Sequence, residues 1–203
     1  MIDTCPIHFW AKETPEKIAI ETGSVCLDYR ALDRRVASLA QQLARQGFVP
    51  GDRLVVPAKG SLDSLLLAWA CLRAGLIFCP LNPAVPVTQQ VGLAKRLQAD
   101  RVCQPESDHA YPSELVPVIL DFLSETEVSS SPVLDSNQLC NTIFTSGSSG
   151  TPKAVLHRVG NHLASARGSA SFIPVDQDSG WLLSLPLFHI GGAAVVFNAL
   201  RTA

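Results

Sequence analysis

Hydroxyl residues, glycines and one lysine gather in a single stretch of the chain, residues 144–153, with the sequence FTSGSSGTPK. Glycine lets the backbone come close to a bound anion and adopt conformations closed to other residues. Hydroxyl groups and consecutive backbone N–H groups donate hydrogen bonds to anions. Lys153 adds a positive charge of the kind that phosphate oxygens favour. The stretch therefore predicts a phosphate-binding loop.

The alternative is a flexible Ser/Gly-rich linker, which this composition also fits. Two apolar runs flank the stretch: residues 139–144 are typical of a buried strand, and residues 154–157 are a second, short strand candidate. A linker rarely lies inside such a hairpin, which favours the phosphate loop. The loop is not of the Walker A type, because Gly150 is followed by Thr151, Pro152 and only then Lys153.

A second stretch, residues 186–192 with the sequence PLFHIGG, also carries chemical groups. His189 follows a run predicted as a strand, residues 181–185, and α/β sheets place ligands at strand ends. The pair Gly191 and Gly192 lets a helix start close to a bound group, and helix N-termini favour anions. The alternatives are an ordinary structural histidine and glycines needed only for tight helix packing.

Alternating strand and helix patterns predict an α/β fold with a mainly parallel sheet. Predicted helices cover residues 6–12 (with Phe9 and Trp10 in the core), 28–47, 62–74, 88–97, 161–171 and 193–200; predicted strands cover 18–20, 25–27, 54–56, 77–83, 101–103, 139–144, 154–157 and 181–185. Asp28 and Ser61 are predicted N-caps. Residues 104–138 are more polar and are interpreted as a connection with one apolar element, at 116–123.

The composition of the chain limits the classes of function that it can be expected to have. The chain has 203 residues, a net charge of −2 and 47% hydrophobic residues, values that give no indication of nucleic-acid or anionic-membrane binding. The longest apolar run, residues 65–72, is too short to span a bilayer. Six scattered cysteines lack zinc-site spacing, and with no recognisable signal peptide they indicate a reducing cytoplasm.

The loop sequence TSGSSGTPK closely resembles the phosphate-loop signature of the adenylate-forming superfamily, which includes acyl-CoA synthetases. Ala154 replaces a glycine common there. The segments 27–54 and 72–83 and the element around His189 are also similar to this superfamily, and overall the chain looks most like its o-succinylbenzoate–CoA ligases of menaquinone biosynthesis.

The resemblance implies an ATP- and Mg²⁺-dependent acid–CoA ligase that forms an acyl adenylate and then a thioester with CoA. It implies a set of nucleotide-binding residues: Thr145, Ser146, Gly147, Ser148, Ser149, Gly150, Thr151 and Lys153. Lys153 and His189 are then the catalytic candidates, and Phe188, His189, Gly191 and Gly192 the acid-binding ones. The residues do not identify metal ligands. Other fatty-acid or aryl-acid CoA ligases and a non-catalytic nucleotide-binding module stay open.

The resemblance covers nearly the whole chain but under half of a typical superfamily member. Residues 1–203 are therefore expected to be the N-terminal part of an AMP-binding domain, without the C-terminal lid domain, and inactive alone. The expected partners are small molecules, namely a carboxylic acid, ATP and CoA. The oligomeric state, a homo-oligomer included, stays open.

Overall fold

The computed structural model describes residues 2–105, 111–128, 131–145, 152–173, 176 and 178–202. Its strands are β1 (Ile2–Thr4), β2 (Ile18–Glu21), β3 (Cys26–Asp28), β4 (Arg53–Pro57), β5 (Ile77–Leu81), β6 (Arg101–Val102), β7 (Val116–Pro117), β8 (Val133–Asp135), β9 (Leu139–Thr145) and β10 (Lys153–Arg158). Its helices are α1 (Pro6–Glu13), α2 (Tyr29–Arg45), α3 (Leu62–Arg73), α4 (Val87–Arg96), α5 (Val159–Ala170) and α6 (Ile190–Thr202).

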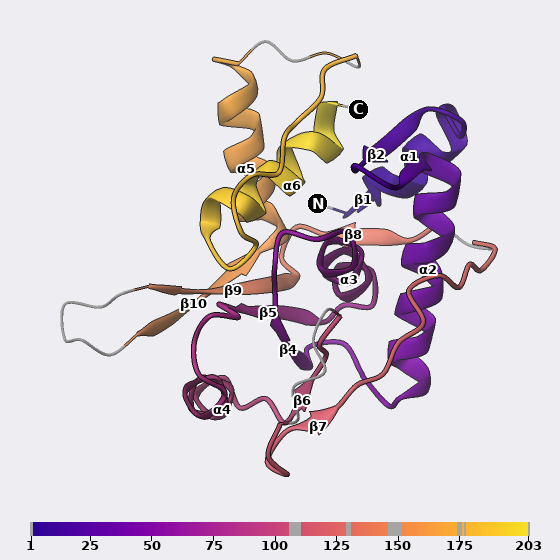
Figure 1. Cartoon of the computed structure of the whole chain (residues 1–203). Helices are drawn as coiled ribbons and strands as arrows, with labels where there is room; N and C mark the ends of the chain where they lie inside the picture. The colour runs from indigo at the N-terminus through magenta and orange to yellow at the C-terminus, as the bar shows by residue number, and fades with distance from the viewer. Residues whose placement is uncertain are drawn as a thin grey trace.

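A six-stranded sheet in the order β10-β9-β5-β4-β6-β7 forms the centre of the molecule (Figure 1). All neighbouring pairs are parallel except β9 with β10, which form an antiparallel hairpin at one edge. Two smaller antiparallel pairs, β1 with β8 and β2 with β3, accompany this sheet. The predicted α/β class with a mainly parallel sheet is confirmed.

The central strands β4 and β5 are buried on both faces, and their alternating side chains enter two separate apolar cores. Leu54, Val56 and Phe78 belong to one core, whereas their chain neighbours Val55 and Ile77 belong to the other. The crossover helices α3 and α4 lie on opposite sides of the sheet (Figure 1). This two-sided burial explains why both strands read as continuous apolar runs instead of alternating ones.

Two helices begin where the sequence predicts. The Asp28 carboxylate accepts a hydrogen bond from the Ala31 amide at 2.7 Å, and Ser61 Oγ accepts one from the Ser64 amide at 3.2 Å. These N-caps satisfy backbone donors that the first helical turn leaves without partners. The predicted apolar stripe of α2 is also confirmed, because Leu32, Val36, Leu39 and Leu43 are all fully buried.

Two predictions about local structure are wrong. Residues 181–185 do not form a strand, and Leu182 is 83% exposed. A strand needs a hydrogen-bonded neighbour, and none of the described segments pairs with this one. Phe9 does not enter the core, because α1 turns Ile7 and His8 inward and leaves Phe9 46% exposed with its ring edge-on to Trp10.

The polar connection runs back along the outer face of α2. Gln46 Nε2 donates to the Ile119 carbonyl at 2.9 Å, and Gln42 bonds both the amide and the carbonyl of Asp121. One turn earlier, Ser38 Oγ donates to Ser124 Oγ at 3.0 Å. These side chains follow each other at four-residue spacing, so one helix face holds an irregular segment without strand pairing.

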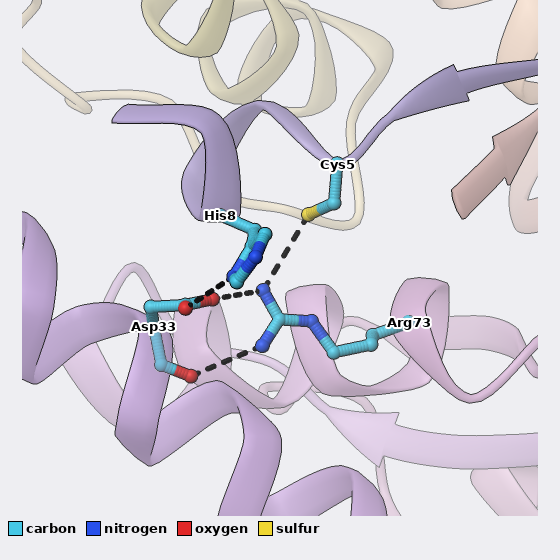
Figure 2. Close-up of polar contacts among 4 residues, drawn as sticks. All are labelled: Cys5, His8, Asp33 and Arg73. Atoms are coloured by element: carbon cyan, nitrogen blue, oxygen red, sulfur yellow. Dashed lines mark hydrogen bonds and ion pairs between the residues drawn. The ribbon is translucent and has the colours of Figure 1, made fainter. Parts of the chain in front are cut away.

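A buried polar cluster joins the first three helices (Figure 2). Asp33 of α2 lies between His8 of α1, whose Nδ1 is 2.8 Å from Oδ2, and Arg73 of α3, whose Nη2 is 2.6 Å from Oδ1. Arg73 also donates to the Asp33 carbonyl at 3.0 Å and to Cys5 Sγ at 3.5 Å. The carboxylate is thereby compensated at a depth where an unpaired charge would be costly.

Along the described part of the chain, no helix combines the length and the apolar character that crossing a membrane requires.

Candidate functional site

The hairpin of β9 and β10 presents the two described residues that border the predicted phosphate loop. Thr145 and Lys153 are its last paired residues, and Thr145 Oγ1 donates to the Lys153 carbonyl at 3.4 Å. Both residues are exposed. Residues 146–151, which include Ser146, Gly147, Ser148, Ser149, Gly150 and Thr151, lie outside the described residues.

The two strands of this hairpin differ in burial because of their places in the sheet. In β9, residues 140–143 are buried between β5 and β10, whereas most of β10 is exposed at the sheet edge. The buried strand fixes the position of its carboxyl end at Thr145. At parallel sheets, ligands bind beyond the carboxyl ends of strands, which is where the loop departs.

The element around His189 is a short backbone turn leading into α6. The His189 amide donates to the Pro186 carbonyl at 3.1 Å, and the His189 carbonyl accepts from the Gly192 amide at 3.1 Å. The imidazole is exposed, and its ring centroid is 4.6 Å from that of half-buried Phe188. The backbone of His189 is therefore held on both sides while its side chain stays accessible.

Close packing accounts for Gly192. A Cβ at this position would lie 2.7 Å from the Pro186 carbonyl carbon and 2.8 Å from the Leu185 oxygen, so any side chain would collide with backbone. At Gly191 the nearest atom to a Cβ is Leu185 Cδ1 at 2.7 Å, the mobile end of a side chain. The packing interpretation therefore explains Gly192, and the acid-binding role of both glycines stays a prediction.

The hairpin and α6 meet in the interior. A cavity of about 40 Å³ is lined by Cys140 and Asn141 of β9 together with Ala193 and Phe197 of α6, among others. The structure thus places the elements that carry the two predicted halves of the site around one small cavity. A larger cavity of about 860 Å³ lies between β2, the start of α3, residues 178–183 and α6, and it contains none of the predicted site residues.

Sequence reasoning missed a buried polar group beneath the hairpin. His162 of α5 places Nε2 2.8 Å from Asn141 Oδ1, its ring stacks on Phe197 with centroids 4.3 Å apart, and the His157 ring is 5.3 Å away. Burial, aided by His157, lowers the pKa of His162 to about 4. The available signal was the spacing of Val159, His162 and Ala166, which puts the histidine on the inward face of α5.

The donor groups at the hairpin end fit phosphate in chemical type, since an ammonium and a hydroxyl are both phosphate partners. Within the described residues, no three histidine, cysteine or acidic side chains gather in a way that could hold a metal ion. The described cysteines are all free thiols, and burial raises the pKa of Cys79, Cys103 and Cys140 to about 12. These thiols are therefore protonated and unsuited to nucleophilic chemistry.

Comparison with known proteins defines the class. The AMP-binding enzyme family matches residues 7–202, and this chain belongs to that family. The 2-succinylbenzoate–CoA ligase of Escherichia coli strain K12 is 33% identical over 195 residues, covering 96% of this chain and 42% of the relative. The ligase of the same name from Bacillus cytotoxicus is 30% identical over 189 residues, covering 91% and 39% respectively.

Solved structures agree with the sequence relatives. A variant of E. coli MenE with bound OSB-AMS has 31% sequence identity and a TM-score of 0.87, covering 98% of this chain and 44% of that one. The o-succinylbenzoate CoA synthetase of Bacillus subtilis in complex with ATP and magnesium ion shares the fold at 23% identity, with a TM-score of 0.85 and 56% of that chain covered.

The predicted resemblance to the adenylate-forming superfamily, and within it to o-succinylbenzoate–CoA ligases, is confirmed. The chain spans about 42% of the length of the E. coli ligase that it matches. In the solved E. coli structure, it corresponds to the N-terminal part of the fold.

Proposed function

We propose that the natural protein to which these 203 residues belong is an ATP-dependent acid–CoA ligase that acts on o-succinylbenzoate in menaquinone biosynthesis. Membership of the AMP-binding enzyme family supports the reaction class. The named relatives support the choice of acid. Because the chain spans less than half of those relatives, residues 1–203 by themselves are expected not to complete the reaction.

The observation that carries the proposal is the hairpin of β9 and β10. It holds the backbone of Thr145 and Lys153, which carry a hydroxyl and an ammonium, at the two ends of a loop whose sequence suits phosphate. In the proposed reaction the loop from Thr145 to Lys153 holds the β- and γ-phosphates of ATP. Positive charge and fixed donors are most effective where negative charge increases in the transition state.

Two steps make up the proposed reaction. A carboxylate oxygen of the acid attacks the α-phosphorus of ATP, and the bond to pyrophosphate breaks to give an acyl adenylate. The sulfur of the CoA thiolate then attacks the acyl carbon, and AMP leaves with the electron pair of the bond that breaks. His189 and Phe188 are the proposed contacts of the acid, from a backbone position held rigidly at the start of α6. Mg²⁺, when bound with ATP, would neutralise part of the phosphate charge, and the described residues identify no ligands for it.

The test is pyrophosphate exchange by the full natural protein with a panel of acids. ATP and labelled pyrophosphate are supplied with o-succinylbenzoate, a fatty acid or a simple aryl acid. Exchange that is strongest with o-succinylbenzoate supports the proposal, and exchange with another acid instead moves the substrate to that acid. If Mg-ATP binds in calorimetry but no acid gives exchange, the protein is a nucleotide-binding module and the proposal is wrong.

A further inference from the structure

A buried imidazole connects the two halves of the proposed site. His162 of α5 is only 3% exposed and lies between β9 and α6. On one side its Nε2 is 2.8 Å from Asn141 Oδ1, and on the other its ring lies flat on Phe197, with an interplanar angle of 6°. No other described residue makes a hydrogen bond to β9 and a ring contact with α6.

The protonation state of this imidazole follows from its surroundings. An amide oxygen can only accept, so Nε2 carries the hydrogen and donates it to Asn141. Of the groups that face the ring, Asn141 and Phe197 do not titrate, whereas His157, whose ring centroid is 5.3 Å away, does. Burial and His157 lower the pKa of His162, so the ring is neutral near pH 7. A neutral ring can stack on Phe197 without a charge to desolvate.

The contacts of His162 with Asn141 and Phe197, called the His162 link below, join the elements that carry the two proposed substrate sites. Asn141 lies in β9 four residues before Thr145, and its partner across the hairpin is His157, four residues after Lys153. Phe197 lies in α6 eight residues after His189, on a helix whose start is fixed by the contact of Gly192 with Pro186. A shift of α6 relative to β9 would therefore change the spacing between the phosphate side and the acid side.

We propose that His162 is a positioning residue for acyl-adenylate formation, which sets the distance between the β9–β10 hairpin and the His189 end of α6. The proposal rests on the ligase function proposed above. In adenylation two separate substrates must meet at about 3–3.5 Å, and a misplacement of about 1 Å can cost on the order of 100-fold in rate. In the second step the acid and the nucleotide are already joined, so their relative placement no longer depends on this link.

The two half-reactions provide an internal control. We would measure adenylation by pyrophosphate exchange, and thioester formation from supplied acyl adenylate and CoA, in the same preparation of the full natural protein. His162→Phe keeps a ring of similar shape for the stack but cannot donate to Asn141. The expected result is a fall of about 10- to 100-fold in the ratio of adenylation to thioester formation, with the KM values for ATP and acid nearly unchanged.

Three further variants separate positioning from stability. Phe197→Leu removes the stack from the other side and is expected to lower the same ratio, whether or not His162→Phe folds. Val159→Ala truncates a fully buried residue of α5 outside the link, so it should lower the melting temperature and leave the ratio unchanged. His162→Gln, which restores an N–H donor toward Asn141, is expected to recover part of the ratio.

The outcomes are distinct. An unchanged ratio in both folded variants, His162→Phe and Phe197→Leu, would overturn the positioning role and leave the ligase function intact. If the wild-type protein adenylates no acid at all, the ligase function fails first and this inference fails with it. If Phe197→Leu alone folds and its ratio equals that of the wild type, the inference is also wrong.

Discussion

Thr145 and Lys153 are paired residues at the loop end of an antiparallel hairpin, and the Thr145 hydroxyl donates to the Lys153 carbonyl at 3.4 Å. Their pairing holds the two ends of the connecting loop at the distance that separates neighbouring strands. The lysine ammonium is thus attached to a strand and not to a free loop, which limits how far the charge moves from the proposed phosphates.

Lys153→Ala should slow adenylation far more than thioester formation from preformed adenylate, because only the first step involves the triphosphate. Loss of one charged donor to developing negative charge is expected to cost about 100-fold in adenylation rate. Pyrophosphate exchange and single-turnover thioester assays on the full natural protein measure the two steps. Lys12→Ala, at an exposed lysine on α1, is the matched control. Equal losses in both steps would contradict the role given to Lys153.

His189→Ala should impair handling of the acid more than handling of ATP. Removal of one hydrogen-bonding group from a carboxylate is expected to lower kcat/KM for the acid by about tenfold. Steady-state kinetics with each substrate varied in turn make the comparison, and Ile190→Ala, at an exposed neighbour, controls for general effects on the turn. An unchanged acid KM and kcat would remove His189 from the site.

Gly192→Ala should destabilise the fold, by about 1–3 kcal/mol, because the added methyl group would meet the Pro186 and Leu185 backbone. Gly191→Ala should cost less, since its new contact is with the movable Leu185 side chain. Gly168→Ala, in the open surroundings of α5, should instead stabilise by up to about 1 kcal/mol. Denaturant unfolding of the three variants would show this order, and a neutral Gly192→Ala would refute the packing explanation.

Asp33→Asn should be strongly destabilising, by about 3–5 kcal/mol, because it leaves the buried Arg73 guanidinium without its counter-charge. The double variant Asp33→Leu with Arg73→Met removes both charges and should cost clearly less. Thermal unfolding of the single and double variants is the measurement. If the double variant were as unstable as Asp33→Asn, the penalty would come from lost packing and not from an unpaired charge.

Folding stability should fall as the pH is lowered from about 6.5 to about 4. In this window an unfolded chain protonates His162, whereas the folded state keeps it neutral because burial lowers its pKa to about 4. The unfolded state then binds more protons, so stability decreases with decreasing pH, by at most about 3 kcal/mol. Burial also lowers the pKa of His157, which acts in the same direction.

Unfolding curves at pH 7 and pH 5 measure this effect, with His162→Phe as the comparison. The variant lacks the titrating group and should lose less stability between the two pH values than the wild type. Equal losses in both proteins would show that His162 already titrates normally in the fold. Neighbouring Cys140 does not contribute in this range, since burial raises the pKa of its thiol to about 12.

Local patterns were sufficient wherever one chemical feature dominated. The Asp28 and Ser61 caps, the apolar stripe of α2 and the buried strands β4 and β5 followed from spacing and residue type. The wrong predictions concern segments whose structure depends on a partner elsewhere in the chain. Residues 181–185 have the composition of a strand, but a strand forms only beside another strand.

By itself, the sequence determined the α/β class, the family and the two strands that flank the predicted phosphate loop, because these depend on periodicity and on a long uninterrupted motif. The tertiary structure alone decided which distant residues meet. The clusters of His8 with Asp33 and Arg73, and of Asn141 with His162 and Phe197, join residues from separate elements. No local rule connects such positions, since their contact depends on how helices pack against the sheet and on the energetic need to pair polar groups that become buried.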